Sequence, residues 1–196
     1  VMGERPWSTL DYKTTDSGVF DRFTTSTGDI AVIGDVRFHN DPQKNRREIN
    51  AALAEGLNPF GYVYRAEDYE VLRAVTFQQK CFYAFELLRQ LRDYDVEFMT
   101  FEPADSGIAS ADNDYLLVPL LYDDSKAILF VINKDLKRQR SGRVYLDIAE
   151  LPFGSEKKCE IRIGDKVQMR ISGSDLKTEG FPVAVEKNTA SVIVIR

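Results

Sequence analysis

The feature that most constrains the fold is a change of hydrophobic period near Asp93. Within residues 67–92 the apolar side chains recur at helical spacing, and arginines stand in the last turn. This stripe consists of Phe77, Cys81, Ala84, Phe85, Leu88 and Leu91. Directly afterwards, "YDVEFMTFE" alternates with the period of two that a strand shows. The pattern predicts a long amphipathic helix over 67–92 and a division of the chain into residues 1–93 and 94–196.

Residues 94–196 have the pattern of an all-β domain. Short runs of apolar and β-branched residues follow one another at the spacing typical of a sandwich or barrel. Turn residues at 123–126 and 164–166 suit hairpins, Pro119 indicates an edge strand or a bulge, and "ADSGIASADNDY" is interpreted as a solvated loop. We therefore expect an antiparallel, jelly-roll-like β-sandwich of about eight strands. The expected strands are "YDVEFMTFE", "DYLLVPLLYDD", "KAILFVINK", "GRVYLDIAEL", "KKCEIRIG", "KVQMRISG", "FPVAVEKN" and "ASVIVIR".

The first 93 residues have a mixed pattern. "DIAVIGDVRF" is a strand candidate, and a short helix is expected after it, with Asp41 as its cap and Pro42 at its first position. Together with the helix over 67–92, this makes an α+β chain with two helices ahead of the sandwich. The apolar face of the longer helix is too broad to stay exposed, so we expect it to pack on the sandwich or on a neighbouring domain or subunit.

Charge and composition restrict the classes of partner. The formal net charge is −5, and no basic run is longer than Lys137–Arg138, which argues against nucleic-acid binding. No apolar stretch reaches the roughly 20 residues of a membrane span. Cys81 and Cys159 do not make a disulfide framework, and we expect two reduced thiols. No cofactor motif is present, so no cofactor is expected.

Three residues of the N-terminal part are candidates for chemistry. Glu4 and Asp35 each follow an apolar run, as catalytic carboxylates at the ends of barrel strands do, and a pair of carboxylates is the requirement of glycoside hydrolysis. His39 lies between an expected strand and an expected helix, where ligands bind in α/β units. The alternative is that all three are ordinary polar residues of loops and turns, and the sequence leaves open whether they form a site.

Metal and sugar binding are less specifically indicated. Asp105, Asp112 and Asp114 lie in one loop, but their spacing lacks the pattern of an EF-hand, so no metal site is expected. Exposed aromatic residues could stack on a glycan, although single aromatic residues more often fill cores. The pairs Trp7 with Tyr12 and Tyr62 with Tyr64 are candidates for such stacking.

Residues 77–196 resemble the C-terminal region of barrel-type glycoside hydrolases such as the α-amylases. The resemblance is carried by "FQQKCFYAFELLRQLRDYDVEF", "KAILFVINKDLKRQRSGRVYLDI" and "FPVAVEKNTASVIVIR". It implies a last barrel helix that leads into a small β-sandwich. A complete barrel needs about 200 residues or more before that sandwich, so the resemblance implies a C-terminal portion. Such a portion would stabilise an enzyme or contact glycans and would not itself catalyse.

A second resemblance is to jelly-roll virus coat proteins, which also have about eight strands and a helix before an inner strand. The residues that carry it are "LLRQLRDYDVEF", and a chain that begins with Val would suit a processed polyprotein product. This resemblance implies a structural subunit that assembles with copies of itself.

Overall fold

The chain divides into two compact units, residues 1–92 and 93–196. The computed structural model describes residues 20–24, 30–34, 42–54, 83, 86–87, 89–91, 94, 99–153, 158–164 and 166–196. For 20–24 and 30–34 it describes the backbone only. No helix within these ranges is long and apolar enough to cross a membrane.

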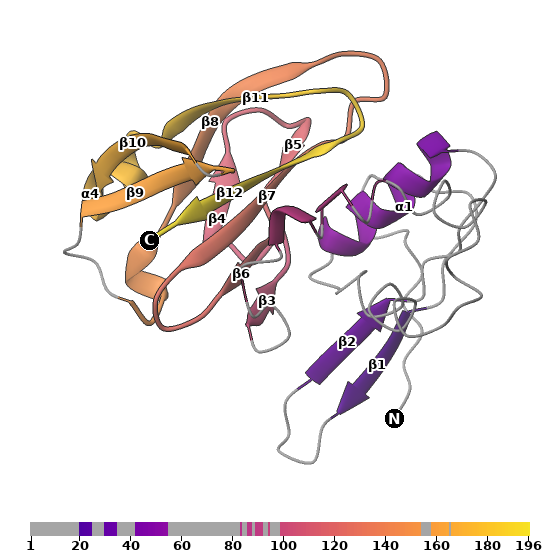
Figure 1. Ribbon diagram of the computed structural model, residues 1–196, viewed down its shortest axis with the longest axis horizontal. Helices are drawn as coiled ribbons and strands as arrows, with labels where there is room; N and C mark the ends of the chain where they lie inside the picture. Colours follow the sequence, from indigo (N-terminus) through magenta and orange to yellow (C-terminus); the bar gives the residue numbers. More distant parts are fainter. Residues whose placement is uncertain are drawn as a thin grey trace. The chain divides into compact units, whose positions relative to one another are not determined.

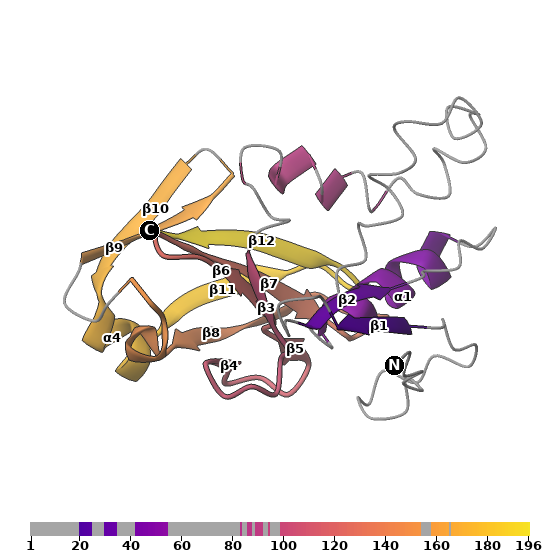
Figure 2. The same cartoon turned by 90° about the horizontal axis from the view of Figure 1, so that it is seen from below.

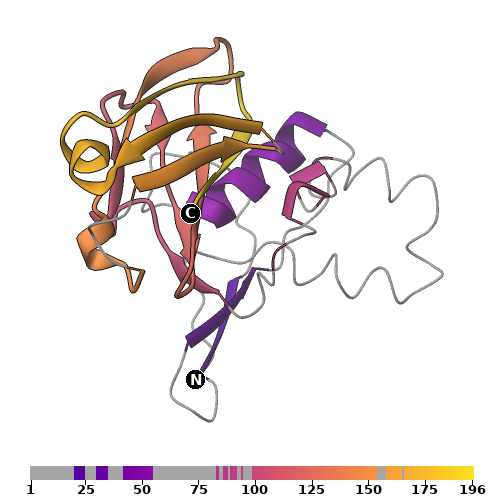
Figure 3. The ribbon, with the colours of Figure 1, turned by 60° about the vertical axis from the view of Figure 1, so that its left-hand side comes forward.

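In the first unit, β1 (Phe20–Thr24) pairs antiparallel with β2 (Ile30–Gly34), as Figure 3 shows. β2 falls within the strand predicted from "DIAVIGDVRF". Helix α1 (Pro42–Ala54) begins at the proline that the sequence places at the first helical position. Ile49 and Leu53 lie four residues apart, on one face of this helix, and are fully buried.

The described part of the segment 67–92 is helical. Tyr83, Leu87 and Leu91 are spaced four residues apart and are buried, whereas Arg89 and Gln90 are exposed. The Tyr83 hydroxyl donates a hydrogen bond of 2.6 Å to Oδ1 of Asn50 in α1. The other residues of the predicted stripe lie outside the described ranges, so the full length of this helix stays a prediction.

The second unit consists mostly of antiparallel strands in two sheets (Figures 1 and 2). One sheet has the order β10-β9-β12-β7-β6-β3, with β5 also paired to β7, and the other has the order β11-β8-β4. The strands are β3 (Thr100–Glu102), β4 (Ala109–Ala111), β5 (Leu116–Leu117), β6 (Leu120–Tyr122), β7 (Ala127–Asn133), β8 (Arg140–Leu146), β9 (Lys158–Ile163), β10 (Lys166–Ser172), β11 (Phe181–Val185) and β12 (Ala190–Ile195).

The two sheets share one apolar core, which makes the unit sandwich-like. Leu129 of β7 and Ile193 of β12 contribute to it from the larger sheet, and Val144 and Phe181 contribute from the smaller one. Every residue of β7 is buried. Because successive side chains of a strand point to opposite faces, β7 is apolar on both faces of its sheet, which explains the unbroken run "AILFVI".

Three predicted strands have different limits in the structure. The segment 114–124 forms two short strands, β5 and β6, which are separated by Val118–Pro119. Both pair with β7 in one continuous register, so the predicted bulge is wrong, and the missing N–H of Pro119 interrupts the ladder instead. Among the described strands β5 pairs with β7 alone, as the alternative of an edge strand predicts. The strand predicted from Gly142 begins earlier, at Arg140, and ends at Leu146. A 3₁₀ turn over Ile148–Glu150 follows, capped by the side chain of Asp147. The strand predicted from Tyr94 is described as β3 from Thr100 onward.

The interpretation of "ADSGIASADNDY" as a solvated loop is wrong at its centre. Ala109–Ala111 form β4, and Ala109 is buried opposite Leu146 of β8. Alanine and serine have little intrinsic strand preference, so the pairing with β8 decides this conformation.

The sequence analysis also missed helix α4 (Gly173–Thr178), which packs on β8 and β10. Ser172 caps its first turn by accepting a hydrogen bond from the backbone N–H of Asp175, at 3.1 Å. Gly180 follows the helix with a φ of 60°, the left-handed conformation that ends many helices. In the segment "SGSDLKTEG", a serine that can cap a helix and a glycine that can end it stand eight residues apart, and this pattern could have predicted the helix.

Candidate functional site

The candidate site residues of the sequence analysis belong mostly to the first unit. Glu4, Asp35, His39 and the four aromatic residues proposed for stacking lie outside the described residues. Of the two thiols, Cys159 is described as a free cysteine and is buried in the core of the sandwich-like unit. Asp105 and Asp124 are exposed, and Asp123 lies in the turn between β6 and β7.

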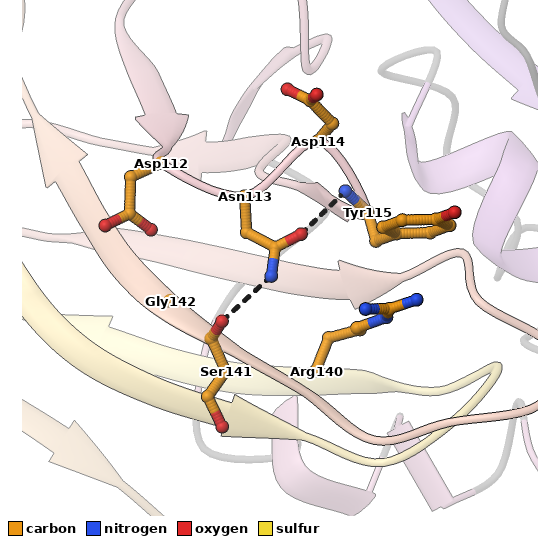
Figure 4. Close-up of a pocket in the computed structure, with 7 residues that line it drawn as sticks. All are labelled: Asp112, Asn113, Asp114, Tyr115, Arg140, Ser141 and Gly142. Atoms are coloured by element: carbon orange, nitrogen blue, oxygen red, sulfur yellow. Dashed lines mark hydrogen bonds between the residues drawn. The ribbon is translucent and has the colours of Figure 1, made fainter.

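A pocket of about 500 Å³ lies where the segment after β4 meets the beginning of β8 (Figure 4). Arg140, Ser141 and Gly142 belong to β8 of the smaller sheet, and residues 112–115 form the connection from β4 of that sheet to β5 of the larger one. The residues that line it are Asp112, Asn113, Asp114, Tyr115, Arg140, Ser141 and Gly142. Two of these, Asp112 and Asp114, belong to the acidic loop that the sequence analysis considered for a metal. Within the described ranges no group of three or more histidine, cysteine or acidic residues could hold a metal ion.

One side of this pocket is formed by an aromatic ring with a cation against one of its faces. In Figure 4 the guanidinium group of Arg140 lies against one face of the Tyr115 ring. The guanidinium carbon is 4.0 Å from the ring centroid, and Tyr115 is 44% exposed. This distance is well within the range of a cation–π interaction. Arg140 is in turn bound by Asp135, with 2.8 Å between Nε and Oδ2. The pair fixes the guanidinium group against one side of the ring.

The loop that carries Asp135 is anchored by a buried amide. Asn133, the last residue of β7, donates from Nδ2 to the carbonyl oxygens of Arg138 and Val185, both at 2.9 Å. Its Oδ1 accepts a hydrogen bond from the backbone N–H of Asp135, also at 2.9 Å. One fully buried side chain therefore ties the β7–β8 loop to β11.

The opposite side of the pocket is held by two adjacent polar side chains. Oδ1 of Asp112 accepts a hydrogen bond of 2.7 Å from the backbone N–H of Arg143. Asn113 donates to the carbonyl oxygen of Ser141 at 2.9 Å and accepts from the backbone N–H of Tyr115 at 3.0 Å. These bonds join the segment 112–115 to β8 and set the position of the Tyr115 backbone.

Gly142 keeps the space between these side chains open. A Cβ atom at this position would lie 2.7 Å from Oδ1 of Asp112 and 3.2 Å from Cβ of Asn113. Any larger residue would press on the two groups that anchor the segment 112–115. The pocket thus offers an exposed ring, a guanidinium group, carboxylates and a hydroxyl, a combination suited to binding a ligand that has both apolar and hydroxyl-bearing surfaces.

Tyr115 and Arg140 were not recognised as site residues from the sequence. The sequence contained two indications, a tyrosine directly after "DND" and the basic segment "KDLKRQR". Their proximity depends on the pairing of β5 with β7 and on the return of the chain into β8, which no local pattern reveals.

Comparison with known proteins finds little similarity. No protein-family model matches the sequence, and no curated protein sequence matches it. Among solved structures, the chain is similar to an α-amylase from Geobacillus thermoleovorans that was crystallised in complex with acarbose. The sequence identity is 18% and the TM-score 0.28, over 43% of this chain and 16% of the amylase. This weak similarity therefore concerns a segment of each protein only.

Proposed function

We propose that this chain is a non-catalytic β-sandwich module, allied to carbohydrate-active enzymes, that contacts glycans through the Tyr115 pocket. The observation that carries the proposal is the exposed Tyr115 ring, supported from behind by Arg140 and flanked by Asp114 and Ser141. A sugar ring has an apolar C–H face and a rim of hydroxyl groups. A tyrosine offers a matching apolar face, and carboxylate, amide and guanidinium groups can bond to the hydroxyls.

Binding is expected to be weak, because the open pocket covers only part of a ligand. Titration calorimetry and affinity electrophoresis with a panel of neutral and acidic oligosaccharides should give a Kd on the order of 0.1–1 mM for the best ligand. Tyr115→Ala should weaken that binding at least about tenfold, whereas Tyr115→Phe should largely retain it because the stacking face is preserved. Val167→Ala is the matched control, since Val167 is a similarly exposed apolar residue on β10.

Absence of binding across the whole panel would remove the glycan proposal. Equal affinity of wild type and Tyr115→Ala would place any glycan site elsewhere on the chain. The proposal also assigns no bond cleavage to this chain alone, so no sugar release is expected from any of these oligosaccharides.

The same proposal includes a partner for the helix over 67–92. Its apolar stripe would pack on a neighbouring domain or subunit, as the last barrel helix does in the enzymes that the sequence resembles. Tyr83, Leu87 and Leu91 are already buried within this chain, so the partner would have to contact the remaining residues of the predicted stripe.

A jelly-roll coat-like subunit that self-assembles is the alternative. Two facing antiparallel sheets with a shared core are the observation that favours it, because this architecture is common to jelly rolls and to other sandwiches. The predicted jelly-roll-like arrangement of about eight strands remains a proposal for either function. Closed particles or capsomers would support it over the glycan-contacting module.

A further inference from the structure

The ring of the candidate site depends on a charge pair that lies behind it. The side chains of Arg140 and Asp135 are only 26% and 11% exposed, and a second nitrogen of Arg140 lies 2.5 Å from the same oxygen of Asp135. With Nε at 2.8 Å, two of the guanidinium nitrogens point at one carboxylate oxygen. The orientation of the guanidinium plane is thus defined by Asp135 and not by solvent.

Asp135 is itself held in place. Its Oδ1 accepts hydrogen bonds from the backbone N–H groups of Lys137, at 2.8 Å, and Arg138, at 3.3 Å. Its own N–H is bound to Asn133, and its carbonyl oxygen accepts from the N–H of Asn188 at 3.0 Å. The hydrogen bonds from the Lys137 backbone and from Arg140 hold the pKa of Asp135 below its ordinary value. Both carboxylate oxygens are therefore occupied, and Asp135 has no oxygen left to turn toward a ligand.

We infer that Asp135 is a positioning residue of the Tyr115 site: it holds Arg140 against one face of the ring, so that a ligand stacks on the other face only. This inference rests on the proposed function for the identity of the ligand. A guanidinium group released from Asp135 would sample several rotamers, and the ring would lose the group that supports it. Asp135 acts through Arg140 and does not touch the sugar.

The substitution that tests this inference is Asp135→Asn. Asparagine retains an oxygen for the turn at Lys137 and Arg138 but removes the negative charge that binds Arg140. Glycan affinity is expected to fall about three- to tenfold. Arg140→Gln, which leaves the Asp135 turn intact, should cause a similar fall. Asp124→Asn is the matched control, because Asp124 is an exposed carboxylate in the turn between β6 and β7, away from the pocket.

A second measurement does not need a ligand. In the wild type, the side-chain protons of Arg140 should show an upfield ring-current shift in the NMR spectrum, because the guanidinium lies over the Tyr115 ring. The shift should collapse in Asp135→Asn and in Tyr115→Leu but persist in Asp124→Asn. Circular dichroism of each variant confirms that the sheets are folded.

Each outcome decides between the two proposals. Loss of both the shift and the affinity in Asp135→Asn supports the positioning role. If Asp135→Asn keeps both the ring-current shift and the glycan affinity, the positioning role is overturned. It is also overturned if the affinity falls while the shift persists, because Asp135 would then act on the ligand directly. If the shift collapses in Asp135→Asn but the wild type binds no glycan, the positioning of Arg140 stands and the proposed function fails.

Discussion

Asn133 illustrates how much one buried side chain determines in this molecule. Its side-chain amide donates hydrogen bonds to one carbonyl oxygen of the β7–β8 loop and to one of β11, and it accepts one from a backbone N–H of the loop. Asn133→Ala would leave the carbonyl oxygen of Val185 buried without this partner and would remove two part-buried hydrogen bonds, so it should lower the free energy of unfolding by about 2–4 kcal/mol. Asn113→Ala is the control, because Asn113 makes comparable bonds in a half-buried position and should cost about 1 kcal/mol. Urea titrations of the two variants measure the difference, and equal losses would contradict the assigned role.

Asp123 gives the second prediction at this scale. Partial burial opposes its ionisation, but hydrogen bonds from Lys126 and Ser125 prevail and lower its pKa from 3.8 to about 2. A carboxyl whose pKa is lower in the folded state stabilises the fold above its unfolded pKa, and loses that effect as the pH falls through its folded pKa.

Asp123→Asn should therefore destabilise the protein by about 1–2 kcal/mol at neutral pH, a value reduced for solvent screening. The difference from wild type should shrink between pH 4 and pH 2, a window that follows from the two pKa values. Urea titrations at pH 2, 3, 4 and 7 test this dependence. A difference that stays constant down to pH 2 would mean that the charge of Asp123 contributes nothing.

At the scale of elements, the end of α4 depends on a glycine. Gly180 has a φ of 60°, and a Cβ atom there would lie 2.4 Å from the carbonyl oxygen of Val144. The backbone N–H of Gly180 also bonds to the carbonyl oxygen of Asp175, and Arg143 donates to the carbonyl oxygens of Glu179 and Gly180. The helix therefore ends against β8 at a contact too close for any side chain.

Gly180→Ala should lower the free energy of unfolding by about 3 kcal/mol, from strain in the left-handed conformation and from the clash with β8. Gly164→Ala is a matched control, because its φ is 57° and nothing lies within 4 Å of the added Cβ atom. Only the conformational strain of about 1–2 kcal/mol applies there. Thermal unfolding of Gly180→Ala and Gly164→Ala measures the loss of stability in each variant, and the difference between the two losses is the contribution of the clash with β8. Equal losses would show that β8 moves aside without cost.

At the scale of the whole molecule, the question is whether the chain assembles into particles. Among the described residues, the large apolar side chains that are exposed are Tyr115, Leu136, Ile163 and Val167. The subunits of a closed shell bury large and mostly apolar interfaces. We therefore expect light scattering coupled to size-exclusion chromatography to show a monomer or small oligomer. Closed particles in electron micrographs would instead favour the coat-like alternative.

The sequence predicted the local elements well where a pattern repeats within a few residues. The strands β7, β9, β10, β11 and β12 lie within the predicted segments, and α1 begins at Pro42 as its proline indicates. Alternation of apolar residues and turn residues at hairpins are local properties, because they reflect which side of a single element faces the core. β4 depended on its pairing with β8, whereas the division of 114–124 into two strands follows from Pro119, which has no N–H to donate. Helix α4 was overlooked although its cap residues were present.

The sequence by itself determined that residues after Asp93 form mostly short strands, since their apolar and β-branched runs, bounded by turn residues, are local properties. It did not determine the candidate site. Tyr115, Asp135 and Arg140 meet because β5 and β8 both lie near the end of β7, and the sum of many weak contacts in the shared core decides that arrangement. Distances between residues that are far apart along the chain are a property of the packed sheets, and only the tertiary structure brings a guanidinium group to within 4.0 Å of a tyrosine ring centroid.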